Sequence, residues 1–142
     1  MRVAMIAVLV LSVVAGARAA ETPLVASKEY KGRVSNEQAK LAPPGGYVSG
    51  PKAWAKLWKD WKMEGKLPVI DWKKEIVLLA MSGGSGMGLT ASVTEAGDLK
   101  MSIIATADIT PDTGYRIIVV PSKGVKTIGG KAPKFEKKDE EP

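Results

Sequence analysis

The feature that most constrains the fold is an uninterrupted apolar run, IVLLAM, at residues 76–81. Six residues match the length of a strand and are too few for a typical helix. A strand with one face in solvent would alternate apolar and polar residues, and this run does not. It therefore predicts a central β-strand that is covered on both faces.

Several other segments carry strand patterns. Residues 28–34 form a plausible short strand, and residues 89–94 alternate apolar side chains with threonine and serine. Residues 99–106 alternate in the same way, except that Ile104 breaks the polar side. Residues 115–120 form a further apolar strand. Because the connections between successive strands are short, antiparallel pairing is expected.

One segment predicts an amphipathic helix. Pro51 suits a first helical position, where its missing N–H would have had no partner, and Gly65 suits a helix end, so the helix is expected over residues 51–64. Its apolar stripe, together with one later indole, is expected to form the helix side of the core: Trp54, Leu57, Trp58, Trp61 and Trp72. The alternative is that the tryptophans form an exposed aromatic platform for a glycan or a peptide.

These elements predict an α+β fold in which one amphipathic helix packs on an antiparallel sheet of four or five strands. The domain is expected to span residues 28–130, after a loose leader at residues 20–27. Residues 35–41 are ambiguous between a helical turn and a loop. The tail at residues 131–142 has mixed charge runs and is expected to be disordered.

Residues 1–19 have the pattern of a secretory signal peptide: a basic start, an apolar stretch and the small-residue sequence Ala17-Arg18-Ala19. An uncleaved anchor is the alternative. The chain has no cysteine that could carry a lipid anchor. From the predicted signal peptide we expect a periplasmic or extracellular protein that is not lipid-anchored and meets the membrane only during export. Cleavage would remove Arg2 and Arg18, which lowers the net charge from +6 to +4.

The chain has no cysteine and no histidine. Disulfides, thiolate metal sites and catalytic pairs with a histidine base are therefore excluded. A dyad of Ser82 or Ser85 with Lys74 or Lys123 has no supporting spacing. We expect no enzymatic activity, no cofactor and no metal.

A glycine-rich segment follows the apolar run, and it lacks both the phosphate-loop pattern and a following helix. It is expected to be a hairpin loop and a possible partner contact, with an anion-binding nest of backbone N–H groups as the alternative. Its residues are Ser82, Gly83, Gly84, Ser85, Gly86, Met87 and Gly88.

A set of lysines is predicted on the helix face opposite the tryptophans: Lys52, Lys56, Lys59, Lys62 and Lys66. A solvated surface is the simpler interpretation. The alternative is a site for an anionic envelope polymer or lipid. No aromatic residue interleaves this face to stack a base, so no nucleic-acid partner is expected.

From residue 51 to about residue 121 the chain resembles the C-terminal domain of the PrcB protease-complex subunit family. The resemblance rests on AWAKLW at residues 53–58, LPVIDW at 67–72, the apolar strand at 76–81 and YRIIVVP at 115–121. This chain departs from the family pattern in the glycine-rich turn after the central strand: the family turn commonly ends in Gly-Gly-Tyr, and this chain has Gly88-Leu89 at that place. The resemblance implies no catalytic residues and an exported accessory or stabilising subunit of an envelope protease complex, with a protein partner.

Overall fold

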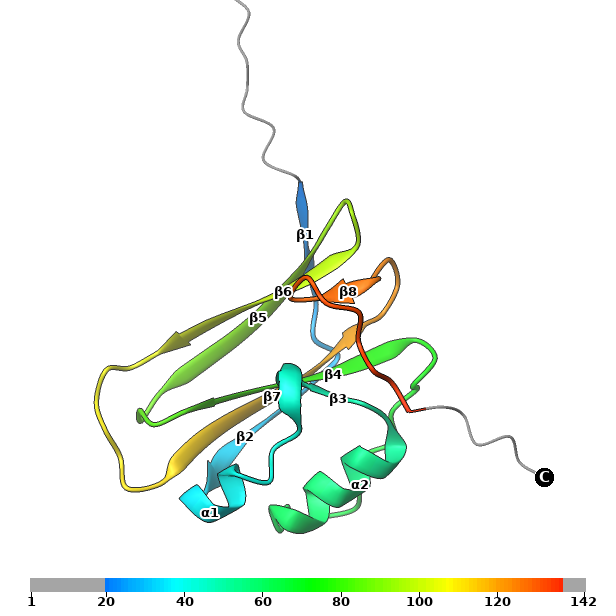
Figure 1. Cartoon of the computed structure of the whole chain (residues 1–142). Coiled ribbons are helices and arrows are strands. Elements are labelled where there is room, and N and C mark those ends of the chain that lie inside the picture. The colour runs from blue at the N-terminus through cyan, green and yellow to red at the C-terminus, as the bar shows by residue number, and fades with distance from the viewer. Residues whose placement is uncertain (1–19, 137–142) are drawn as a thin grey trace, which may run out of the picture.

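The computed structural model describes residues 20–136. The predicted signal peptide and the last part of the predicted tail, residues 137–142, lie outside the described residues. The elements in chain order are β1 (Glu21–Leu24), β2 (Lys28–Val34), α1 (Asn36–Ala39), the 3-10 turn η1 (Pro44–Gly46), β3 (Tyr47–Val48), α2 (Pro51–Asp60), β4 (Glu75–Ser82), β5 (Met87–Thr94), β6 (Asp98–Ala105), β7 (Thr113–Pro121) and β8 (Thr127–Ile128) (Figure 1).

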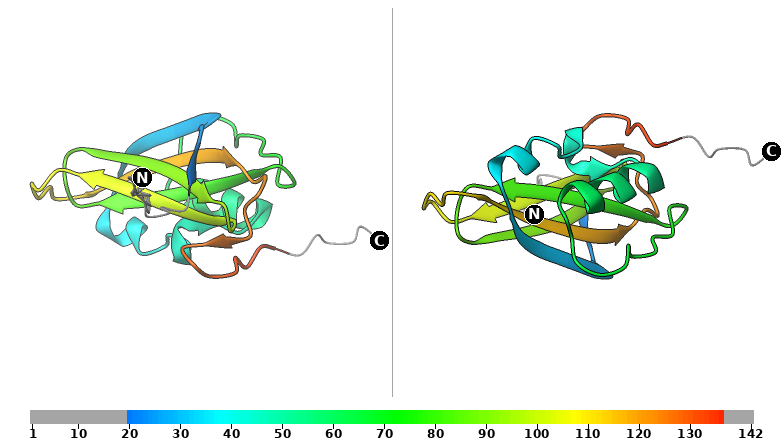
Figure 2. Two further views of the ribbon diagram at one scale, coloured as in Figure 1. Left: turned by 90° about the horizontal axis from the view of Figure 1, so that it is seen from above. Right: turned by 90° about the horizontal axis from the view of Figure 1, so that it is seen from below.

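The strands form two sheets of four strands each, so the prediction of one sheet of four or five strands was wrong. The first sheet has the order β1-β5-β6-β8 and the second has the order β2-β7-β4-β3. All pairs are antiparallel except β6 with β8, which is parallel. Helix α2 lies across the outer face of the second sheet, and the first sheet covers its inner face (Figure 2). The broader α+β class therefore holds, but as three layers.

The central strand is β4, and the prediction that both of its faces are covered is confirmed. Val77 and Leu79 belong to the core beneath α2, while Ile76, Leu78 and Ala80 belong to the core between the sheets. All five side chains are buried. One helix can cover only one face of a strand, so the second face requires another layer, which β5 and β6 supply.

The apolar stripe of α2 faces the second sheet. Trp54, Leu57 and Trp61 are buried, and Trp58 and Trp72 are partly buried against the same core. The indole N–H of Trp54 donates to the carbonyl of Pro68 at 3.1 Å, and that of Trp61 donates to the carbonyl of Gln38 at 2.8 Å. These rings therefore fill the core and also hold the flanking loops in place.

Helix α2 ends at Asp60, four residues before the predicted end at residue 64. Lys62 adopts a left-handed backbone conformation with φ of 47°. Its N–H donates to the carbonyl of Lys59 at 3.1 Å, and the N–H of Met63 donates to the carbonyl of Trp58 at 3.0 Å. This is the Schellman motif, which usually has glycine in the left-handed position, and here a lysine takes it.

Both terminal segments contact the domain. The expected loose leader contains β1, which pairs with β5. Residues 131–136, the described part of the predicted tail, form a segment that we call the C-terminal strap, which runs from β8 to the start of α2 (Figure 1). Tyr47 fixes the strap by accepting a 2.7 Å hydrogen bond from the backbone of Lys134 and by an edge-to-face contact with Phe135. Residues 35–41, ambiguous in sequence, contain α1, which begins with a Ser35–Gln38 capping box.

Candidate functional site

The glycine-rich loop at residues 82–88 crosses from the second sheet to the first. It is not the predicted hairpin loop, because β4 pairs with β7 and β3, whereas β5 pairs with β1 and β6. A second crossing loop, residues 106–112, returns from β6 to β7 at the same end of the sandwich. The two loops are joined by backbone hydrogen bonds of 2.9 Å from Thr106 to Gly86 and from Thr110 to Gly83.

Three backbone N–H groups in the middle of the glycine-rich loop are already bonded. Gly84 donates to the Ser82 hydroxyl at 3.1 Å, Ser85 donates to the Asp108 carboxylate at 3.1 Å, and Gly86 donates to the Thr106 hydroxyl at 3.0 Å. The side-chain hydrogen bonds from Ser85 and Thr106, followed by that from the Ser85 backbone, lower the pKa of Asp108 to about 2. Ser82 and the second crossing loop supply these acceptors, so the geometry does not favour the anion-binding nest.

Arg33 ties β2 to both crossing loops. Its Nε lies 2.6 Å from a carboxylate oxygen of Asp112, and its Nη1 lies 3.2 Å from the carbonyl oxygen of Gly84. Its Nη2 donates to the hydroxyl of Thr110. The guanidinium therefore holds the loops together instead of pointing freely at a ligand.

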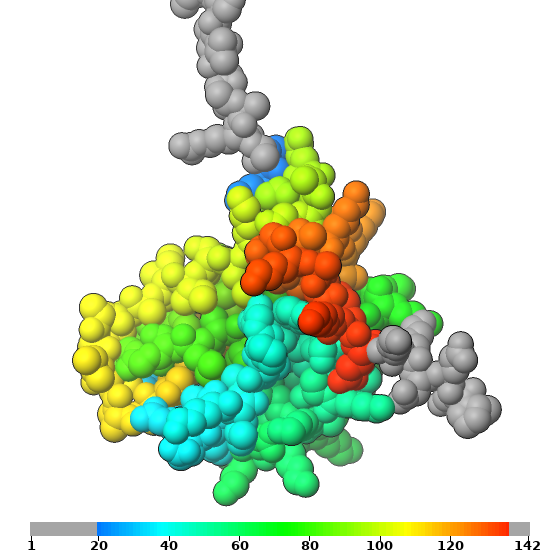
Figure 3. All heavy atoms as spheres, viewed as in Figure 1, coloured from blue at the N-terminus to red at the C-terminus, as the bar shows by residue number. Residues whose placement is uncertain are grey.

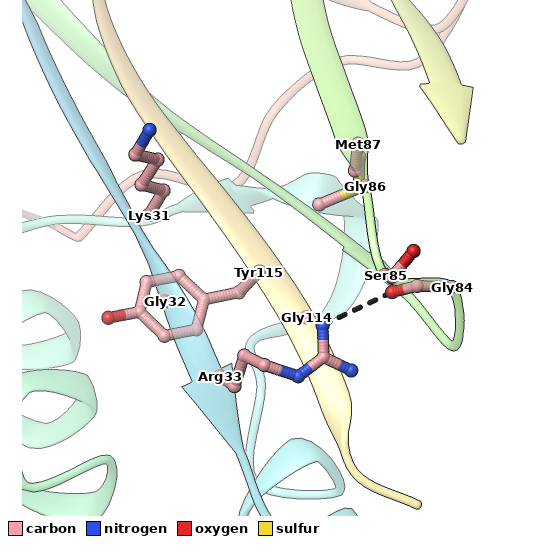
Figure 4. A pocket seen from close by; sticks show the side chains of 9 residues that line it. All are labelled: Lys31, Gly32, Arg33, Gly84, Ser85, Gly86, Met87, Gly114 and Tyr115. Carbon is pink, nitrogen blue, oxygen red and sulfur yellow. Dashed lines mark hydrogen bonds between the residues drawn. The ribbon is translucent and has the colours of Figure 1, made fainter. Parts of the chain in front are cut away.

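Beside Arg33 is a hollow of about 340 Å³, lined by Lys31, Met87, Tyr115 and loop glycines (Figure 4). The Tyr115 ring crosses Gly32, where a Cβ would lie 2.7 Å from the phenolic oxygen. Burial raises the pKa of Tyr115. The hollow thus presents an amine, a thioether and a neutral phenol, with the neighbouring guanidinium already paired.

The end of the sandwich carries exposed apolar side chains on β6 and the second crossing loop. Ile103 is 50% exposed, Ile104 is 76% exposed and Ile109 is 94% exposed. This end, coloured yellow, stands out at the left of the molecule (Figure 3). We call Ile104 and Ile109 the apolar end, because Ile103 turns its side chain to the opposite face of β6 from Ile104. Sequence reasoning noted the irregular Ile104 but not the surface to which it belongs.

The structure separates the lysines that the sequence grouped on one helix face. All five are exposed, but Lys62 and Lys66 lie beyond the end of α2. Lys56 pairs with Asp60 at 2.5 Å. The basic helix face is therefore smaller than predicted, because the helix ends at the Schellman motif.

The serine–lysine dyads are not formed. Ser82 ends β4, whereas Lys74 precedes its first residue and Lys123 follows β7 at that same far end. Among residues 20–136, no three acidic side chains gather as a metal site would require. Within that range no helix is long and apolar enough to cross a membrane.

Comparisons with protein-family models, with curated proteins and with solved structures found no match.

Proposed function

We propose that this chain is an exported, non-enzymatic protein-interaction module whose contact surface is the apolar end. The observation that carries the proposal is the exposure of Ile104 and Ile109, at 76% and 94%, at the end of the sandwich where the two crossing loops meet. Burying such side chains against a partner is favourable by about 1.5–3 kcal/mol for each one that becomes fully covered. Apolar surface that stays exposed on a folded domain is a common feature of protein-binding sites when its side chains lie together.

The crossing loops support the proposal because they hold the surface in one arrangement. Arg33, Asp108 and Thr106 link the loops to each other and to β2 through side-chain and backbone bonds. A surface that is already ordered loses less conformational entropy on binding. The resemblance to PrcB subunits supports a partner in an envelope protease complex, in which this chain would act as an accessory or stabilising subunit.

The test is capture of partners from native envelope extract, with identification by mass spectrometry. The double variant Ile104→Lys/Ile109→Lys is expected to lose the captured protein. Val25→Lys is the matched control, because Val25 is an 80% exposed valine in the connection between β1 and β2. A protease recovered with the wild type and the control, but not with the double variant, supports the proposal. Equal recovery with all three proteins contradicts the assigned surface.

The second candidate is a binder of anionic polymer or lipid through Lys52, Lys56, Lys59, Lys62 and Lys66. The exposure of all five side chains favours it. Such binding should collapse between low and moderate ionic strength, whereas an apolar protein interface should largely persist. Sedimentation with anionic vesicles at two salt concentrations separates the two functions.

A further inference from the structure

A groove of about 610 Å³ runs beside the outer edge of β6. Leu99, Met101 and Ile103 of β6 line one side, and Tyr47 and Ile128 contribute further apolar wall. The C-terminal strap forms the remaining side with Lys131 and Lys134. The groove is distinct from the hollow beside Arg33, which is lined by β2, β7 and the glycine-rich loop.

The register shows which backbone groups of β6 face this groove. The carbonyl of Leu99 points away from β5, because it accepts a 2.9 Å hydrogen bond from Gly129, just after β8. The N–H of Thr106 points toward β5, because it donates to Gly86. Since bonding direction alternates along a strand, Met101, Ile103 and Ala105 turn their N–H and C=O groups outward.

These outward groups have no strand partner among the described residues. Strand β8 is two residues long and pairs with Asp98 and Leu99 only. The edge of β6 from Met101 to Ala105 is therefore open, and it lies against an apolar groove. An open edge of this kind is a ready template for another strand.

The edge strands β1, β2 and β3 have features that discourage strand addition. Strand β1 carries Pro23, β3 has two residues, and β2 is rich in charged side chains. The stretch of β6 from Met101 to Ala105 has no charged side chain and no proline. Met101–Ala105 is therefore an uncharged, proline-free stretch of edge at the site where the fold also supplies an apolar groove.

Charge indicates what kind of strand fits. Lys131 and Lys134 lie at the strap side of the groove, and neither forms an ion pair with another described residue. Their ammonium groups complement an acidic ligand. The strap follows β8, so it lies toward the Leu99 end of β6 and away from the crossing loops.

We propose that the β6 groove binds an extended segment of a partner protein by strand addition. The segment pairs antiparallel with Met101–Ala105, places apolar side chains at alternate positions in the groove, and carries acidic residues at its C-terminal end beside Lys131 and Lys134. This mode of recognition takes affinity from main-chain bonds and specificity from the pockets. It rests on the proposed function, since it names how the interaction module holds its partner.

The test uses a fluorescent peptide in which valine and threonine alternate and two glutamates follow at the C-terminus. Fluorescence anisotropy with the full-length protein is expected to show saturable binding. A peptide with the glutamates moved to the N-terminus is expected to bind about tenfold more weakly. The double variant Lys131→Glu/Lys134→Glu is expected to reverse the preference, favouring a peptide that ends in two lysines.

Two variants of adjacent residues separate the groove, which Ile103 lines, from the apolar end, to which Ile104 belongs. Ile103→Pro removes an outward N–H without breaking the bonds of β6 to β5, and it is expected to weaken peptide binding about tenfold. Ile104→Lys changes the opposite face of β6 and is expected to bind the peptide like the wild type. If the Ile103→Pro variant does not fold, hydrogen exchange of the backbone amides in the wild type provides the test instead. Bound peptide should slow the exchange of the Met101, Ile103 and Ala105 amides.

The proposal is overturned if the peptide does not bind. It is also overturned if bound peptide does not slow amide exchange selectively at the alternate residues Met101, Ile103 and Ala105. A third result would also overturn it: light scattering shows that the wild type is a dimer and that the Ile103→Pro variant is a monomer. A second copy of the chain would then occupy the edge of β6. If the strand-addition proposal fails but partner capture still depends on Ile104 and Ile109, the proposed function is still supported.

Discussion

Glu136 caps the helix that begins at Pro51: its Oε1 accepts a 2.8 Å hydrogen bond from the backbone nitrogen of Ala53. Its Oε2 accepts a second bond from the backbone nitrogen of Lys52 at 3.0 Å. The residue before the helix, Gly50, has no side chain that could do this. A carboxylate from the strap therefore supplies the missing cap, at the end of the helix where negative charge is stabilising.

Replacing Glu136 with alanine is expected to lower the free energy of unfolding by about 1 kcal/mol, because two N–H groups lose their acceptor. Glu136→Gln is expected to cost less, since the amide oxygen still accepts one bond. Urea unfolding followed by tryptophan fluorescence measures both. Glu95→Ala removes an exposed carboxylate from the turn between β5 and β6 and should leave stability unchanged. Equal stability of the Glu136→Ala variant and the wild type would contradict the cap.

Lys62→Gly is expected to raise the free energy of unfolding by about 0.5–1 kcal/mol. The left-handed backbone at φ of 47° is strained for lysine and free of strain for glycine. Lys59→Gly, in the last turn of α2, provides the opposite case and should destabilise by a similar amount. Thermal unfolding by circular dichroism distinguishes them, and a Lys62→Gly variant less stable than the wild type would refute the prediction.

Gly84→Ala is expected to destabilise the protein by about 1–3 kcal/mol. A Cβ at this position would lie 2.7 Å from the hydroxyl oxygen of Thr106 and would also collide with the Thr106 carbonyl. Gly83→Ala is the matched control, because a Cβ there meets nothing within 4 Å. Chemical denaturation of the two variants should separate them, and similar midpoints would show that the crossing loops are not packed as described.

Asp108 is expected to stabilise the crossing loops in a pH-dependent way. Its pKa is lowered from 3.8 to about 2 by hydrogen bonds, first from the Ser85 hydroxyl and then from Thr106. The folded protein favours the charged carboxylate. Its stabilisation is therefore complete above pH 3.8, the ordinary pKa, and is lost as the pH falls through about 2, the pKa in the folded protein. The melting temperatures of wild type and Asp108→Asn should therefore converge as the solution is acidified. A constant difference would contradict the prediction.

The sequence predicted the covered central strand but not what covers it. The run at residues 76–81 has apolar side chains on both sides, so it requires two covering layers, and the helix signal accounted for one. The alternation at residues 89–94 predicts a strand, but it is equally compatible with a place in the sheet of β4 and with a place in a second sheet. The strand pairing distinguishes the two arrangements: β5 pairs with β1 and β6, whereas β4 pairs with β3 and β7.

The strap and the helix end show where local patterns fail. Glycine is the usual residue at a helix C-terminus, so Gly65 was the natural choice, yet Lys62 takes the left-handed position. The segment at residues 131–136 has the composition of a disordered tail, and its order depends on contacts with Tyr47 and α2. The groove beside β6 has no local signal either, since it arises from the shortness of β8.

The contact between Glu136 and Ala53 spans 83 residues of sequence, so it closes a loop that contains strands β4 to β8. A ten-residue helix is marginal by itself in water, and its cap cannot form until β8 has brought the strap into position. The start of α2 should thus be completed after the rate-limiting step of folding, and loss of the Glu136 carboxylate should accelerate unfolding while leaving the folding rate nearly unchanged.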